Sequence, residues 1–134
     1  MESRYWSIDR LPGLMLREQE LLKRNNITDT KELLNQTSTP NSRLALANQL
    51  KMNLKQINKL VALADLARLP SVGYRYCGLL LHAGMISVTQ VAQTPFHRLH
   101  RQIVRLQVAT LQRKDLSPPV EEVRRWVEEA RLLK

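Results

Sequence analysis

Cysteine, aromatic residues and long apolar runs are scarce in this chain of 134 residues. Its single cysteine, Cys77, excludes an internal disulfide and any zinc site built from several cysteines. Aromatic residues make up only 4% of the chain, so base stacking on exposed rings is a poor candidate for its main mode of binding. The longest apolar run is far shorter than the ~20 residues that span a bilayer, and no signal-peptide pattern opens the chain. We therefore expect a cytoplasmic protein with no transmembrane segment.

Acidic residues are absent from the 49 residues between Leu66 and Lys114, although the whole chain holds 21 Lys+Arg against 12 Asp+Glu, a net charge of +9. Without neighbouring carboxylates, the positive potential of this stretch extends about a Debye length, ~8 Å at physiological salt, and predicts an anionic partner. An alternative is that acidic residues of the C-terminal segment fold over the stretch and neutralise it. The basic residues and histidines of the stretch are Arg68, Arg75, His82, His97, Arg98, His100, Arg101, Arg105, Arg113 and Lys114, and the acidic residues are Glu121, Glu122, Glu128 and Glu129.

Apolar residues recur at steps of three and four along the chain, without sustained alternation, which predicts helices throughout. Hydrophobic residues make up 43% and charged residues 25%, the mixture of a soluble globular protein, and the length suits one domain over residues 1–134. We therefore expect an all-α, single compact domain. Capping side chains predict the starts of five helices, and these residues are Asp29, Thr39, Asn53, Ser87 and Thr94.

Two parts of the sequence resemble each other. Residues 10–17 and 68–75 each carry an arginine at both ends and a Leu-Pro pair after the first. Further on, the pattern Thr-Pro-x-x-Arg-Leu of residues 39–44 returns at residues 94–99. We therefore predict two copies of a four-helix unit, approximately 8–66 and 67–134. The alternative is chance similarity among leucine-rich helical segments.

Each copy contains a Leu-Pro turn between two helices, at residues 11–15 (Leu-Pro-Gly-Leu-Met) and 69–73 (Leu-Pro-Ser-Val-Gly). An aliphatic-Pro-Gly-aliphatic-Gly turn resembles the helix-hairpin-helix motif, and the pair resembles the tandem, SAM-like arrangement of that family. The resemblance implies that backbone N–H groups at the start of the second helix contact a phosphate oxygen of nucleic acid. Each turn departs from the motif at one glycine, because Ser71 replaces the first and Met15 replaces the second.

The second turn is the better candidate for an anion site, because no acidic residue follows it until Asp115. We assign to this site Arg68, Ser71, Val72, Gly73 and Arg75. The first turn is a secondary candidate, because Glu18 and Glu20 follow it closely, and its residues are Arg10, Gly13 and Arg17. The alternative is that both turns only connect packed helices.

A basic row is expected on the helix that begins after Pro95. His97, Arg101 and Arg105 fall at i, i+4 and i+8, with Arg98 beside them, and such a row can follow a phosphate backbone. The same face could instead bind an acidic protein or an anionic lipid surface. An apolar stripe on another face of this helix should turn toward the core, and it consists of Phe96, Leu99, Ile103 and Leu106.

The sequence contains few residue patterns typical of catalytic or metal sites. His97 and His100 could share a metal, but no carboxylate lies near them in sequence and no HExxH pattern occurs. Cys77 lies among apolar residues and reads as a small buried hydrophobe rather than a nucleophile. We expect no enzymatic activity, no metal site and no cofactor.

Over nearly its whole length the chain also resembles a cyanobacterial protein family of unknown function with helix-hairpin-helix character. The resemblance is carried by residues 6–14 (Trp-x-Ile-x-x-Leu-Pro-Gly-Leu), 61–73 and 76–84, and it implies a cytoplasmic helical protein. The leading hypothesis is a module that binds the backbone of nucleic acid, duplex DNA in particular, without sequence preference. The alternative is a helical adaptor for an acidic protein partner, which the cyanobacterial resemblance would associate with the photosynthetic machinery.

Overall fold

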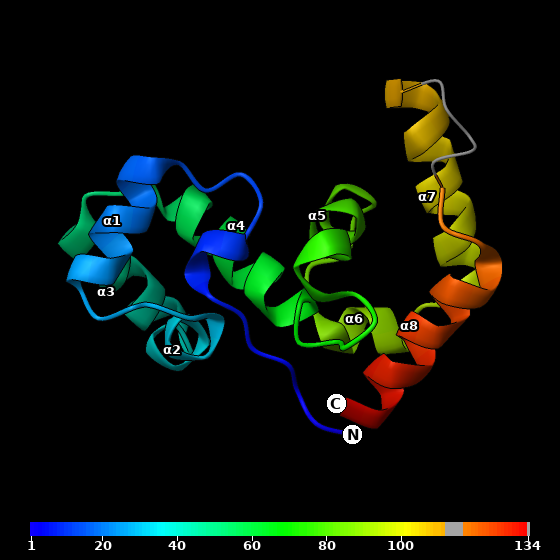
Figure 1. The fold of residues 1–134 in the computed structure, drawn as a ribbon, viewed down its shortest axis with the longest axis horizontal. Helices are drawn as coiled ribbons and strands as arrows, with labels where there is room; N and C mark the ends of the chain where they lie inside the picture. The colour runs from blue at the N-terminus through cyan, green and yellow to red at the C-terminus, as the bar shows by residue number, and fades with distance from the viewer. Residues whose placement is uncertain (112–116, 134) are drawn as a thin grey trace.

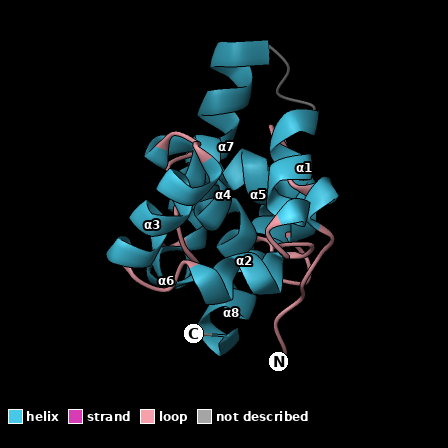
Figure 2. Ribbon diagram, turned by 90° about the vertical axis from the view of Figure 1, so that its left-hand side faces the viewer, coloured by secondary structure: helices cyan, strands magenta, loops and turns pink. Residues whose placement is uncertain are grey.

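The computed structural model describes residues 1–111 and 117–133 of the chain. In these residues a short 3-10 helix, η1 (Ile8–Arg10), precedes eight α-helices (Figure 1). The described part holds no strand, apart from an isolated bridge between Ser7 and Asp29, which confirms the expected all-α class (Figure 2). The α-helices are α1 (Leu16–Arg24), α2 (Thr30–Gln36), α3 (Pro40–Leu50), α4 (Leu54–Leu66), α5 (Gly73–His82), α6 (Val88–Gln93), α7 (Phe96–Leu111) and α8 (Val120–Leu133).

Capping side chains begin four helices where the sequence predicts them. Asp29 accepts a hydrogen bond from the Glu32 amide at 2.8 Å at the start of α2, a pairing that the capping spacing indicates. The hydroxyl of Thr39 caps α3 and the amide oxygen of Asn53 caps α4. The hydroxyl of Ser87 caps α6 in the same way.

Thr94 behaves differently from the other predicted caps. Its hydroxyl donates to the Gln90 carbonyl at 2.7 Å, so it satisfies the end of α6 rather than the start of α7. The first backbone bond of α7 runs from the Leu99 amide to the Pro95 carbonyl at 3.0 Å.

Helix α4 joins the two ends of the molecule. It packs against α2 and α3 on one side and against α5 on the other, as Figure 1 shows. Buried residues such as Ile57, Leu60 and Leu63 occur at helical spacing along it and form the middle of the core. The last helix, α8, packs in turn against α6 and α7 and buries Trp126 completely.

The N-terminal segment ties these parts together. The Trp6 indole N–H donates to the Ala67 carbonyl at 2.7 Å, and the Trp6 amide donates to the Thr30 hydroxyl at 3.0 Å. The Trp6 ring meets Tyr74 edge-on, with 5.0 Å between ring centres. Trp6 therefore fixes α2, the end of α4 and the start of α5 relative to each other. No helix among residues 1–111 and 117–133 has the length and hydropathy of a membrane span.

Candidate anion-binding surfaces

The second Leu-Pro turn connects α4 to α5, and its backbone donors are used inside the protein. The amides of Val72 and Gly73 both donate to the Leu69 carbonyl, at 3.0 and 2.9 Å. Leu69 and Val72 have buried side chains that anchor the turn in the core. Pro70 has no amide proton to donate. The Ser71 N–H is therefore the remaining donor, because it forms no hydrogen bond within the turn.

A carboxylate from α8 occupies that remaining donor. The Ser71 amide donates to Glu129 Oε1 at 2.9 Å and the Ser71 hydroxyl donates to Oε2 at 2.5 Å. The Trp126 indole N–H donates to the Ser71 carbonyl at 3.2 Å, and Glu129 is only 7% exposed. The Glu129 carboxylate therefore occupies the position at which the sequence predicts a phosphate oxygen.

The backbone of Gly73 lies close to the Trp6 side chain of the same protein, rather than to an exposed phosphate site. Its φ is +53°, and a Cβ at this position would lie 3.0 Å from Cζ2 of Trp6. The missing side chain therefore lets the Trp6 indole pack against the start of α5.

The two arginines beside the second turn have different surroundings. Arg68 is half-buried and pairs with Asp65, at 2.9 Å between Nη2 and Oδ1. The other carboxylate oxygen of Asp65 accepts the Val88 amide at 2.8 Å, so this acid links α4, the turn and α6. Arg75 is exposed on α5, and no ion pair holds it within the described residues. Of the residues assigned to this turn, Arg75 presents its charge to the surface.

The first turn remains more open than the second. Gly13 is exposed, with a φ of +74°, and Lys59 Nζ lies 3.2 Å from the place of a Cβ at Gly13. Arg17 is exposed next to it, while the Arg10 guanidinium lies 5.3 Å from the centre of the Tyr74 ring. A lysine that is distant in sequence therefore supplies a positive charge at this turn.

A carboxylate also caps the helix that follows the first turn. Glu18 Oε1 accepts the Met15 amide at 3.0 Å and the Gln56 side-chain amide at 3.1 Å. Glu18, which the sequence places close to the first turn, thus bonds directly to the last residue of that turn. In both turns, a carboxylate of the protein takes a backbone N–H close to the start of the following helix.

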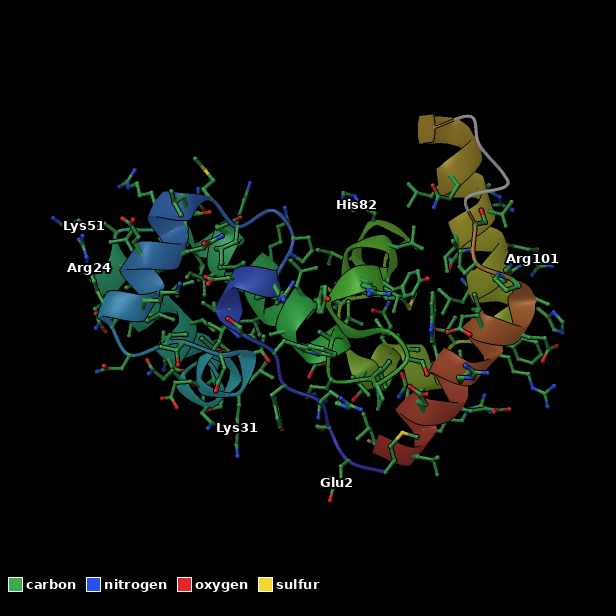
Figure 3. All side chains as sticks on the ribbon, viewed as in Figure 1. Glu2, Arg24, Lys31, Lys51, His82 and Arg101 are labelled. Carbon is green, nitrogen blue, oxygen red and sulfur yellow. The ribbon has the colours of Figure 1, made fainter. Side chains whose placement is uncertain are left out.

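The basic row of α7 lies on the outside of the molecule. His97, Arg101 and Arg105 are exposed, as is Arg98 beside them, whereas Leu99 and Ile103 are fully buried. Figure 3 places Arg101 at the outer edge of α7. The other two residues of the predicted stripe are half-buried, and they are Phe96 and Leu106.

The acidic residues of α8 bind partners other than this row. Glu121 and Glu128 both pair with Arg124, at 3.7 and 3.0 Å, and Glu122 pairs with Arg125 at 3.3 Å. The fourth acid is bound to Ser71, as described above. Within residues 1–111 and 117–133, the arginines of the row consequently have no ion-pair partner. Arg113 and Lys114, which the sequence adds to the same basic stretch, and Asp115 lie outside the described residues.

Cys77 and the histidines offer little chemistry. Burial raises the pKa of the Cys77 thiol to about 11, so the thiol is protonated at neutral pH. In the part of the chain that the structure describes, no three potential ligands among His, Cys, Asp and Glu come together in one cluster.

Two features of these surfaces are missing from the sequence-based assignment. The first is the specific contact of Glu129 with Ser71, which are 58 residues apart. Its signal is an acid three residues after Trp126, on the buried face of an amphipathic helix. The second is a pair of lysines on α4, Lys55 and Lys59, whose i, i+4 spacing places them on one exposed face.

Comparison with known proteins bears on the chain as a whole. No curated protein and no solved structure matches it. One family model matches residues 12–133, a range that includes the second Leu-Pro turn, the first turn from Pro12 onward, and the basic row. The family is described as a domain of unknown function, DUF4332, and because the match covers most of the chain, this protein belongs to that family.

Proposed function

We propose that this protein is a non-enzymatic module that binds the backbone of nucleic acid, duplex DNA in particular, through the basic row of α7. The observation that carries the proposal is that Arg98, Arg101 and Arg105 are exposed while the nearby acids of α8 are paired elsewhere. An uncompensated row of this kind attracts a polyanion and gains affinity from released counterions.

The dimensions of the row suit a phosphate backbone. Residues four apart on a helix are separated by about 6 Å along its axis, so His97 to Arg105 extends about 12 Å. Phosphates of one DNA strand follow each other every ~3.4 Å along the duplex axis, so several of them lie within this reach. The sequence carries no motif typical of proteins that read bases, which supports binding without sequence preference.

We also propose that the chain consists of two tandem units with helix-hairpin-helix character, residues 8–66 and 67–134. Packing supports this organisation, because α2 and α3 contact α4 as α6 and α7 contact α8. In this arrangement Arg75, beside the second turn, and Gly13 with Lys59, at the first turn, are further candidate phosphate contacts.

Charge reversal on α7 tests the proposal. Arg101→Glu/Arg105→Glu should weaken binding to a short DNA duplex about tenfold or more at ~50 mM salt, measured by fluorescence anisotropy. The matched control is Arg24→Glu/Lys51→Glu, which changes the net charge equally at the opposite end of the molecule (Figure 3). This control should weaken binding less than about threefold. Equal losses in the two double variants would show that net charge, and not the row, determines binding.

A second candidate function is a helical adaptor that binds an acidic protein partner. It is favoured by the carboxylates of Glu18 and Glu129, which already fill backbone donors at both turns. If the wild-type chain fails to bind DNA even at ~50 mM salt, where phosphate contacts are strongest, the adaptor function takes precedence.

A further inference from the structure

A groove runs along one exposed side of α4. Its volume is about 920 Å³, and its lining includes Lys55, Lys59 and Ala62 from α4. One wall comes from α2, the start of α3 and the connection between them. The other wall comes from the end of α5 and the start of α6. The groove is distinct from the α7 row, because His97, Arg98, Arg101 and Arg105 are not among the residues that line it.

The charge of this groove is positive and uncompensated. Arg43, Lys55 and Lys59 line it, and none of them forms an ion pair with any residue that the structure describes. Arg43 is held in place by a bond from its Nε to the Thr37 carbonyl at 3.2 Å. Asp65 also lines the groove, but Arg68 neutralises it. The groove therefore presents Arg43 and Lys55 to an occupant, together with Lys59, whose Nζ lies beside Gly13 and which the groove shares with the first turn.

Apolar side chains accompany these charges. Leu34 and Leu81 are half-buried in opposite walls, and Ala62 lies between them on α4. Ile86 is 63% exposed at the rim, among the most exposed large apolar residues of the chain. Covering this surface would be favourable by about 25 cal/mol for each Å² of apolar area buried.

We propose that this groove binds an acidic, amphipathic segment of a partner protein. Its apolar side chains would contact Leu81 and Ile86, and its carboxylates would pair with Arg43, Lys55 and Lys59. The volume equals that of about two turns of a helix with a diameter of ~10 Å. Amphipathic helices bind apolar grooves through residues at i, i+3 and i+4, and the opposite charges would set the orientation of the segment.

Nucleic acid fits this groove less well than a peptide does. A phosphate backbone has no apolar side to cover Leu81 and Ile86, and a single strand would need rings on which to stack its bases. Tyr5 is the only aromatic residue among the described ones that line the groove. Lys31 Nζ already lies 5.7 Å from the centre of the Tyr5 ring. The combination of apolar side chains in both walls with basic residues along α4 and α3 thus favours an acidic peptide.

Peptide display on the full chain tests this inference. Random peptides of about 15 residues, long enough for four helical turns, are selected at ~150 mM salt, where surface charges are screened beyond ~8 Å. Enriched peptides should be acidic and carry apolar residues at i, i+3 and i+4. Enrichment of no peptides, or of peptides without this pattern, would overturn the inference.

Variants then locate the binding site of the enriched peptides. Lys55→Glu/Lys59→Glu and, separately, Ile86→Glu should each weaken binding about tenfold or more. All three side chains are exposed, and circular dichroism checks that the variants remain folded. Arg24→Glu/Lys51→Glu is the control of equal charge and should leave affinity within about threefold.

Other occupants give different results. Arg101→Glu/Arg105→Glu should leave peptide affinity unchanged, so a failure of DNA binding and a failure of this inference are separate outcomes. Peptides that bind the groove variants as well as the wild type would overturn the inference. Binding of oligodeoxythymidylate that is lost in Ile86→Glu would instead assign the groove to a single nucleic-acid strand. Self-association that is lost in the same variant would assign it to a second copy of the chain.

Discussion

Glu129 combines burial with charge, since its side chain is 7% exposed and both of its carboxylate oxygens accept hydrogen bonds from Ser71. Removing a carboxylate from water is costly unless charged hydrogen bonds replace the lost hydration. The amide and hydroxyl of Ser71 provide two such bonds, and the Trp126 indole holds the Ser71 carbonyl in place. The contact therefore fastens α8 to the turn between α4 and α5.

Removing this carboxylate should destabilise the fold. We expect Glu129→Ala to lower the free energy of unfolding by about 1.5–3 kcal/mol, the range for a hydrogen-bonded charged group that leaves its partner unsatisfied. Urea unfolding followed by circular dichroism measures this change.

The neighbouring acid provides the control for this prediction. Glu128 is exposed and pairs only with Arg124 on its own helix, so Glu128→Ala should cost less than about 1 kcal/mol. If the two variants unfold at the same urea concentration, the contact between Glu129 and Ser71 does not stabilise the fold as proposed.

At the scale of the element, helix starts follow directly from the sequence. Asp29, Thr39 and Ser87 each bond to an amide three residues later, so a short stretch of sequence contains both the donor and the acceptor. The exposed row of α7 is predictable for a similar reason, because helical spacing alone places His97, Arg101 and Arg105 on one face.

Contacts between distant elements are not predictable in this way. Helical spacing places Glu129 on the buried face of α8, but it does not name Ser71 as the partner, and nothing local places Lys59 beside Gly13, because packing of α8 and α4 creates both contacts. The local pattern also fails at Thr94, whose hydroxyl donates to the Gln90 carbonyl at the end of α6. Sequence patterns thus define the helices and the α7 row, whereas packing decides what the turns bind.

The start of α5 depends on a glycine at the second turn. Gly73→Ala should destabilise the protein by about 2–4 kcal/mol, since the new Cβ would need a left-handed backbone and would lie 3.0 Å from Trp6. Gly84→Ala is the control, because its φ is +99° but nothing lies within 4 Å of a Cβ there. It should cost only about 1–2 kcal/mol in thermal or urea unfolding. Equal losses would mean that the Trp6 contact contributes nothing.

On the scale of the whole molecule, positive charge is unevenly distributed. The acids of α8 pair with arginines of their own helix or bind Ser71 of the second turn, so the excess positive charge of the chain, whose net charge is +9, lies outside α8. The α7 row and the α4 groove are two separate basic surfaces, and they differ in character. The row is polar and extended, which suits a phosphate backbone, while the groove adds apolar side chains in its walls, which suits a peptide.

The salt dependence of DNA binding tests the central role of the α7 row most directly. If Arg98, Arg101 and Arg105 each neutralise one phosphate, affinity for a DNA duplex should fall at least about 40-fold between ~50 and ~200 mM salt. The slope of log affinity against log salt should become shallower by about two units in Arg101→Glu/Arg105→Glu. A wild-type chain that does not bind at ~50 mM salt, or a slope that the double variant leaves unchanged, would contradict the account.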